Sequence, residues 1–157
     1  KKDGTITAAN SSSISDGAAA LVMMRESTAA KRGLAPIARI VAHATHAQKA
    51  SLFATAPAPA IRQVVAKAGW TMSDVDLFEL NEAFAVVTLL AMDELGLSHD
   101  VVNVNGGACA MGHPIGATGA RIIVTLLHAL RRRGLKRGVA GLCIGGGEAT
   151  ATAIEIL

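Results

Sequence analysis

The chain has 157 residues, of which 51% are hydrophobic and only 3% aromatic, with 16 glycines, two cysteines and a formal net charge of +3. Two cysteines cannot build a disulfide framework, and no His/Cys spacing is typical of a zinc site. The few aromatic residues exclude a stacking platform for nucleic acid, and no uncharged run predicts a membrane span. We therefore expect one globular domain without a metal, in a reducing, cytoplasmic compartment.

The chain starts at Lys1 rather than Met, and no signal peptide is recognisable. We expect the sequence to be processed or to be a fragment of a longer one.

The first part of the chain predicts a loop followed by two strands and two helices. Polar residues dominate the loop at 10–16, and the apolar run 17–24 predicts a buried strand. A short helix over 25–32 should end at Gly33, and 37–45 predicts a second strand. The next helix should begin at Pro59 and end at Gly69.

The second part alternates between strands and helices. Residues 75–80 predict a strand, and Asn81 is a good N-cap for a helix that Gly96 ends. A short extended run follows at 101–104, and an apolar stripe over 115–130 predicts a helix that Gly134 ends. The last two strands, joined by a short glycine loop, should be antiparallel; they are 139–143 and 150–156. This alternation predicts a layered α/β fold.

One glycine-rich segment carries a histidine and opens directly into a predicted helix. It reads GHPIGATGAR over residues 112–121. Pro114 stiffens the backbone at His113, and the positive helix end disfavours an imidazolium there. A neutral imidazole in this position can exchange protons near neutral pH, so we predict that His113 is functional.

Two further residues carry chemistry but also have ordinary structural interpretations. Cys143 ends an apolar strand, where a cysteine often serves as a small hydrophobic residue. The glycines that follow, beginning with Gly145, can direct N–H groups at a thiolate or at a negative oxygen on a substrate. Asn81 on its own residue pattern is better explained as a helix cap than as a catalytic group. Cys109 and the other four histidines match no motif, and the glycines do not form a phosphate-binding loop.

Three motifs in order, NEAFA (81–85), GHPIGATGAR (112–121) and CIGGG (143–147), together with residues 4–20, resemble the C-terminal half of the thiolase family. The resemblance covers essentially all of residues 1–157. It implies a βαβαβαββ domain, an α/β fold with a mixed five-stranded sheet and helices on both faces. It also implies a missing N-terminal half that carries the nucleophilic cysteine.

The resemblance assigns roles to individual residues. His113 activates the nucleophilic cysteine and binds the thioester oxygen, and Asn81 holds a water in the same oxyanion hole. Cys143 removes and returns the α-proton of acetyl-CoA, and the Gly145 N–H belongs to a second oxyanion hole. Ser12 lies beside the pantetheine arm of coenzyme A, and Phe84 lines the acyl pocket.

The implied reaction joins two acetyl-CoA molecules into acetoacetyl-CoA and CoA, or runs in reverse as thiolysis, through an acyl-cysteine. It needs no cofactor, because the CoA thioester is the substrate. The family also implies a homo-oligomer, either a dimer or a tetramer. A loop that usually reads MGTGP is FATAP here, and Phe53 could reshape the acyl pocket.

Three alternatives remain open. The chain could be a non-catalytic module that binds CoA thioesters or a partner, or part of a 3-ketoacyl-CoA thiolase of longer-chain degradation. A related condensing enzyme is a further alternative, against which the Cys143 loop argues.

Overall fold

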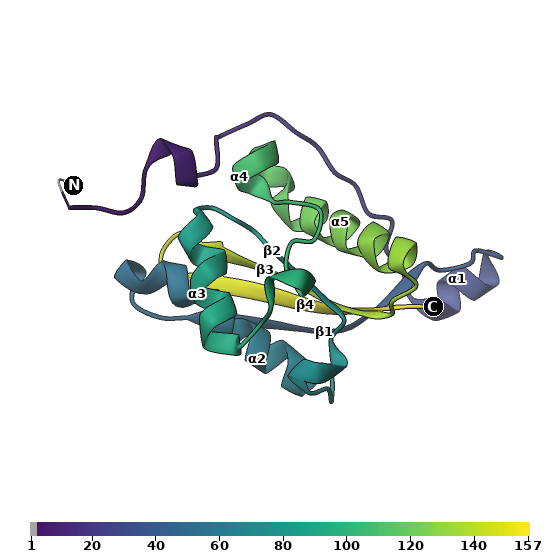
Figure 1. Ribbon diagram of the computed structural model, residues 1–157. Helices are drawn as coiled ribbons and strands as arrows, with labels where there is room; N and C mark the ends of the chain where they lie inside the picture. Colours follow the sequence, from purple (N-terminus) through teal and green to yellow (C-terminus); the bar gives the residue numbers. More distant parts are fainter. Residues whose placement is uncertain (1–2) are drawn as a thin grey trace.

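The computed structural model describes residues 3–157, and its centre is one mixed sheet (Figure 1). The spatial order of the strands is β1-β4-β3-β2. β2 runs parallel to β3, whereas β4 is antiparallel to both β3 and β1. The predicted antiparallel pairing of the last two strands is confirmed. The strands are β1 (Ala38–Ala47), β2 (Leu77–Leu80), β3 (Arg137–Ile144) and β4 (Glu148–Ile156).

Helices cover both faces of the sheet, as predicted. α2 packs against β1, β3 and β4, with α3 beside it, and α5 packs on the opposite face against β2 and β3 (Figure 1). The helices are α1 (Glu26–Lys31), α2 (Pro57–Lys67), α3 (Ala85–Leu95), α4 (Ala108–Met111) and α5 (Thr118–Arg133). Short 3₁₀ turns occur at Ala8–Asn10, Ala50–Thr55, Met72–Asp74, His99–Val101 and Ile115–Ala117.

The two faces of the sheet form two separate apolar clusters. Successive residues of a strand point to opposite faces. In β2, Phe78 and Leu80 therefore join the cluster under α2, whereas Leu77 joins the cluster under α5. Glu79 follows this alternation and lies toward α5, although all four residues of β2 are buried.

The sheet of the described residues has four strands rather than five, and two predicted strands are corrected. The run 17–24 pairs with nothing, and Val22 in it is 89% exposed. The run 101–104 contributes only a single bridge between Val102 and Phe78. An apolar run becomes a strand only where an open sheet edge lies beside it to complete its hydrogen bonds.

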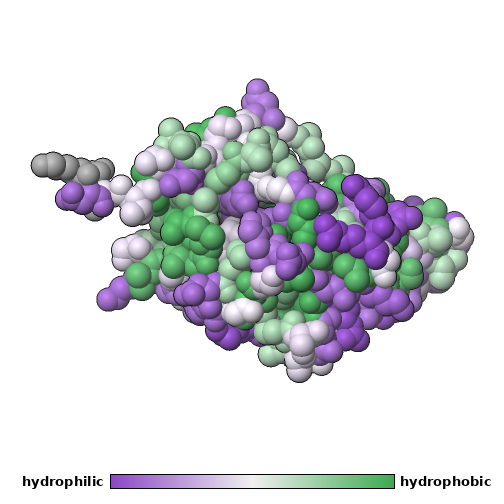
Figure 2. Space-filling model, viewed as in Figure 1, coloured by the Kyte–Doolittle hydropathy of each residue, from purple (hydrophilic) through white to green (hydrophobic). Residues whose placement is uncertain are grey.

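Residues 11–25 form an extended segment that arcs past α4 and α5 toward α1 (Figure 1). It is tied down at its start, where the Ser12 N–H donates to the Ala83 carbonyl at 3.3 Å and the His113 N–H donates to the Ser13 carbonyl at 2.8 Å. Further along, Met23 is 68% exposed. The surface in Figure 2 mixes apolar and polar areas rather than being uniformly polar. Within residues 3–157, no helix is long and apolar enough to cross a membrane.

Candidate active site

The site lies at the carboxyl ends of the two parallel strands β2 and β3. The backbone N–H of Asn81 donates to the Gly141 carbonyl at 2.9 Å, which continues the β2–β3 ladder by one residue. Asn81 therefore lies next to the part of β3 that leads to Cys143. In open α/β sheets, ligands bind outside the carboxyl ends of the strands.

His113 is held on both sides of its ring and at its backbone. Its Nδ1 lies 2.8 Å from Thr118 Oγ1, and the single hydroxyl proton of Thr118 is donated to the Pro114 carbonyl at 3.1 Å. Thr118 must then accept from His113, so the neutral ring carries its proton on Nδ1. Nε2 is left without a proton and can act only as an acceptor, which is the state that a general base requires.

The Asn81 side chain contributes to this arrangement rather than capping a helix. Its Nδ2 lies 3.5 Å from His113 Nε2, and its Oδ1 accepts from Arg121 Nη2 at 3.3 Å. α3 begins at Ala85 with Phe84 at the N-cap, so the N-cap prediction for Asn81 is wrong. Because arginine only donates, Asn81 Oδ1 must face Arg121, and the amide N–H groups face His113.

The electrostatics of the site favour a neutral imidazole. Burial, followed by the charge of Arg121, lowers the pKa of His113 below its usual value. The hydrogen bonds also indicate a neutral ring, because Nδ1 donates and Nε2 can only accept. His113 is therefore set to accept a proton at neutral pH.

Cys143 and Gly145 lie at the end of β3 and in the turn to β4. Burial raises the pKa of the Cys143 thiol, so the chain by itself holds it protonated. This direction argues against a preformed thiolate in the glycine turn. Gly145 is exposed, while Gly147 has φ of 90° and packs so close to the Gln48 and Lys49 carbonyls that a side chain there would collide with them.

The three residues expected beside coenzyme A, Ser12, Phe53 and Phe84, are brought together by contacts around residues 83–84. Ser12 Oγ donates to the Ala83 carbonyl at 2.9 Å, next to Phe84. The ring of Phe84 meets that of Phe53 edge-on, with centroids 6.1 Å apart. The structure thus links Ser12, Phe53 and Phe84, and the Ser13 carbonyl, next to Ser12, accepts from the His113 N–H at 2.8 Å. Within residues 3–157 no hydrogen bond joins His113 to Cys143.

Three residues that organise the site were assigned no role from the sequence, although Arg121 ends the motif at 112–121. Glu79 and Arg121 form an ion pair of 2.9 Å whose side chains are 2% and 14% exposed. The sequence signal for Glu79 is a charge between the apolar residues Phe78 and Leu80 of a predicted strand that also contains Asp76. Asn103 caps the end of β2, because its amide exchanges hydrogen bonds with the Leu80 N–H (2.7 Å) and carbonyl (2.8 Å).

Cys109 does not have the properties of a nucleophile. Burial, and then the Glu82 carboxylate, raise the pKa of its thiol. Its backbone N–H donates to Glu82 Oε2 at 3.0 Å, which ties α4 to the segment after β2. Cys109 therefore serves as a packed residue. Among residues 3–157, no group of His, Cys, Asp or Glu is placed to hold a metal ion.

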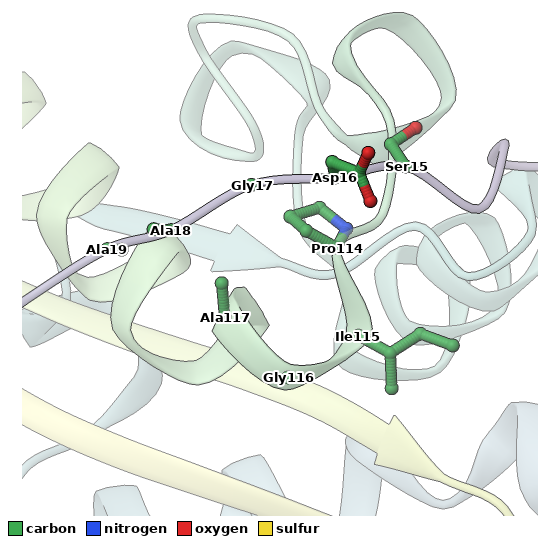
Figure 3. A pocket seen from close by; sticks show the side chains of 9 residues that line it. All are labelled: Ser15, Asp16, Gly17, Ala18, Ala19, Pro114, Ile115, Gly116 and Ala117. Carbon is green, nitrogen blue, oxygen red and sulfur yellow. The ribbon is translucent and has the colours of Figure 1, made fainter.

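A shallow hollow borders the site where the extended segment crosses the turn before α5 (Figure 3). Gly17 lies directly on Pro114, and a Cβ at Gly17 would come within 2.8 Å of the proline Cγ. Asp16 lies next to this contact, and Ile115 points away from the segment (Figure 3). The close contact explains why glycine is needed at position 17.

Comparison with known proteins adds two family matches. Residues 34–156 match "Thiolase, C-terminal domain", and residues 1–27 match "Thiolase, N-terminal domain". The two matched regions meet between residues 27 and 34, close to α1. The exposed run 17–24 therefore falls in the region that matches the N-terminal domain, and the sheet falls in the region that matches the C-terminal domain.

Among curated relatives, the cytosolic acetyl-CoA acetyltransferase of Mus musculus is 54% identical over 97% of this chain and 38% of its own length. The acetyl-CoA acetyltransferase of Rhizobium meliloti is 50% identical over 99% of this chain and 40% of its own length. The chain thus spans about two fifths of the relatives that it matches.

Two solved structures share the fold over the whole chain. The Bacillus anthracis acetyl-CoA acetyltransferase has a TM-score of 0.97 at 49% identity, and human mitochondrial 3-ketoacyl-CoA thiolase has 0.93 at 43%. This chain covers 40% of the length of each of these two solved chains.

Proposed function

The chain belongs to the thiolase family, and from this premise we propose that it is the C-terminal catalytic part of an acetyl-CoA acetyltransferase. The reaction joins two acetyl-CoA molecules into acetoacetyl-CoA and CoA, or reverses this by thiolysis. The observation that carries the proposal is the pairing of a neutral His113, its Nε2 free to accept, with the Asn81 amide at the sheet edge.

In the first half-reaction, His113 is proposed to act on a cysteine of an N-terminal thiolase half. Nε2 accepts the thiol proton as the sulfur attacks the thioester carbonyl of acetyl-CoA. The new C–S bond forms, the CoA sulfur leaves, and the proton returns to it from His113. The Asn81 amide, through a water, and His113 stabilise the oxyanion that forms on the carbonyl.

In the second half-reaction, Cys143 is proposed to exchange a proton with the second substrate. The Cys143 thiol first gives its proton to water, the resulting thiolate removes the α-proton of acetyl-CoA, and the carbanion attacks the acyl-cysteine. A C–C bond forms and the C–S bond breaks. In thiolysis Cys143 instead gives its proton to the leaving acetyl-CoA carbanion, which requires the thiol that burial favours. The Gly145 N–H is proposed to donate to the thioester oxygen of this substrate.

Ser12, Phe53 and Phe84 are proposed to border the pantetheine arm and the acyl group. The edge-on contact between Phe53 and Phe84 fills space next to the site, which favours a short acyl group. A thiolase acting on longer 3-ketoacyl chains is the second candidate, since a named 3-ketoacyl-CoA thiolase is 43% identical. Activity on acyl chains of increasing length, with Phe53→Met as the comparison, distinguishes these candidates.

The N-terminal thiolase half is the proposed partner within the enzyme. The match of residues 1–27 to the N-terminal domain, and the exposure of Val22 at 89%, support a surface that this half covers. We also propose a homo-oligomer in the cytoplasm, the latter in line with the cytosolic name of the mouse relative.

The test joins the N-terminal half of the Rhizobium meliloti relative to this chain and measures acylation and condensation separately. We expect acetyl-CoA to acylate the joined protein, and Cys143→Ala to abolish condensation while sparing acylation. Cys109→Ala is the matched control and should retain both activities.

Normal condensation by the Cys143→Ala variant overturns the proton-exchange role. A joined protein that binds CoA thioesters but is never acylated supports the non-catalytic module instead.

A further inference from the structure

A continuous line of polar contacts connects the buried strand β2 to His113. It runs from the Glu79 carboxylate to Arg121 Nη1 (2.9 Å), from Arg121 Nη2 to Asn81 Oδ1 (3.3 Å), and from Asn81 Nδ2 to His113 Nε2 (3.5 Å). Glu79 is 1% exposed as a residue and Asn81 is also 1% exposed. Such a buried network is costly unless its members satisfy each other.

We propose that the Glu79–Arg121 ion pair is a positioning pair, which fixes the orientation of the Asn81 amide and so keeps a donor facing Nε2 of His113. The inference rests on the proposed function, because it assigns to these two residues a part in acyl transfer. Neither of them contacts the reacting atoms, so both act through Asn81 and His113.

The orientation of Asn81 follows from donor and acceptor chemistry. An asparagine amide can rotate by 180°, which would exchange its oxygen and nitrogen. Arg121 has only donors, so the rotated amide would place N–H groups against N–H groups. With Arg121 in place, the amide nitrogen faces His113, and a donor is available there for an oxyanion or its water.

The part played by Glu79 is to hold the guanidinium in position. Arg121 lies in the first turn of α5, where its positive charge is unfavourable beside the helix N-terminus. The Glu79 carboxyl opposite it, on the facing strand, accepts from Arg121 Nη1 in either protonation state, and its ionised form offsets this cost. Arg121 Nε is buried and has no hydrogen-bond partner among the described residues, so the two Nη groups carry the contacts.

Arg121 also acts on His113 by charge. Its guanidinium lowers the pKa of His113, in addition to the effect of burial. The other charged or titratable groups around His113 are Glu79 on β2, Asp16 in the hollow beside Pro114, and Glu82 and Cys109, which contact each other near α4. Arg121 differs from these groups because it contacts Asn81, whose amide faces His113.

The charge and the geometry of Arg121 can be separated with two substitutions. Arg121→Lys keeps the positive charge but cannot place two donors in the fork that reaches Glu79 and Asn81. Arg121→Met removes both the charge and the donors while keeping the length. Arg132→Met, on the exposed last turn of the same helix, is the matched control.

The first measurement is ¹⁵N NMR of the histidine rings in the full 157-residue chain, with His113 assigned through a His113→Gln variant. We expect the Nδ1–H tautomer in the parent chain and in Arg132→Met. In Arg121→Met the pKa of His113 should rise, because the repulsion by the guanidinium is removed. In Arg121→Lys that pKa should stay near the parent value.

The second measurement is the pH profile of acyl transfer by the chain joined to the Rhizobium meliloti N-terminal half. Activity needs neutral His113, so it falls as the pH drops through the pKa of this residue. Arg121→Met should therefore move the acid limb of kcat to higher pH, whereas Arg121→Lys should leave the limb in place. Both should lower kcat roughly 10- to 100-fold at little change in KM.

An unchanged pKa of His113 in Arg121→Met, or an unchanged kcat in Arg121→Lys, overturns the positioning role. If the Arg121→Met variant fails to fold, the double variant Glu79→Leu/Arg121→Met also removes the carboxyl that has lost its partner. The same NMR measurement of the His113 pKa is then made on the double variant. An inactive parent protein contradicts the proposed function, but the NMR result still decides the positioning role.

Discussion

The run 17–24 and strand β3 are similar in sequence and opposite in environment. Both are short apolar segments, yet Val22 is 89% exposed, whereas Val139 in β3 is fully buried. β3 lies between two strands and under helices on both faces, and the run 17–24 has no strand beside it. An apolar pattern therefore identifies residues that burial would stabilise. Whether they are buried depends on the strands and helices that pack against them.

The strongest test of this difference removes an apolar side chain from the run 17–24 and another from α5, which packs on β3. Leu126 of α5 is 1% exposed and packs on Gly138 of β3. Leu126→Ala should lower the free energy of unfolding by roughly 2–5 kcal/mol, because it leaves a cavity. Val22→Ala should change it by less than about 0.5 kcal/mol. Urea denaturation of the full chain measures both, and equal losses would contradict the contrast.

The second test uses the buried carboxyl of β2. Burial raises the pKa of Glu79 from 4.5 to about 7, even though Arg121 opposes the shift. A carboxyl with a raised folded-state pKa stabilises the fold below pH 4.5, and this contribution is lost as the pH rises through 7.

Compared with Glu79→Gln, the parent chain should therefore lose on the order of 3 kcal/mol of stability between pH 4 and pH 8. Glu26→Gln, at a side chain that is 76% exposed, is the control and should show no such trend. Urea titrations at several pH values give the comparison. Parallel stability curves for Glu79→Gln and the parent would show that the carboxyl is not buried as described.

Val22→Lys should have the smallest effect on the free energy of unfolding. It is also the substitution that tests association with an N-terminal thiolase half. In the chain alone this exposed position should tolerate a charge, with a change within about 0.5 kcal/mol. In the presence of an N-terminal thiolase half, the same charge should weaken association, because a buried lysine lacks a partner. Titration calorimetry with Lys31→Val as the control checks this. Unimpaired association would place the partner elsewhere.

The sequence was a good guide where the pattern is local. Gly33, Gly96 and Gly134 end helices as predicted, each with a positive φ that glycine adopts readily. The glycine loop after Cys143 joins two antiparallel strands, as its length required. The motif around His113 lies at the start of α5, where the segment predicted it.

The errors have a common physical cause. Asn81 has the side chain of a helix cap, but the distant Arg121 takes its oxygen, and α3 begins four residues later. The run 101–104 is extended, but only Val102 reaches a neighbouring strand. In both cases a contact made in three dimensions overrides a local preference.

The sequence by itself determined the alternation of strands and helices, the ends of the helices, and the presence of His113, Asn81 and Cys143 in recognisable motifs. These depend on the periodicity of side chains and on glycine and proline, which act within a few residues. The tertiary structure decided which way the Asn81 amide faces, which nitrogen of His113 carries the proton, and that Glu79 and Arg121 meet. Those outcomes depend on donors and acceptors up to 42 positions apart, which only folding brings within hydrogen-bond distance.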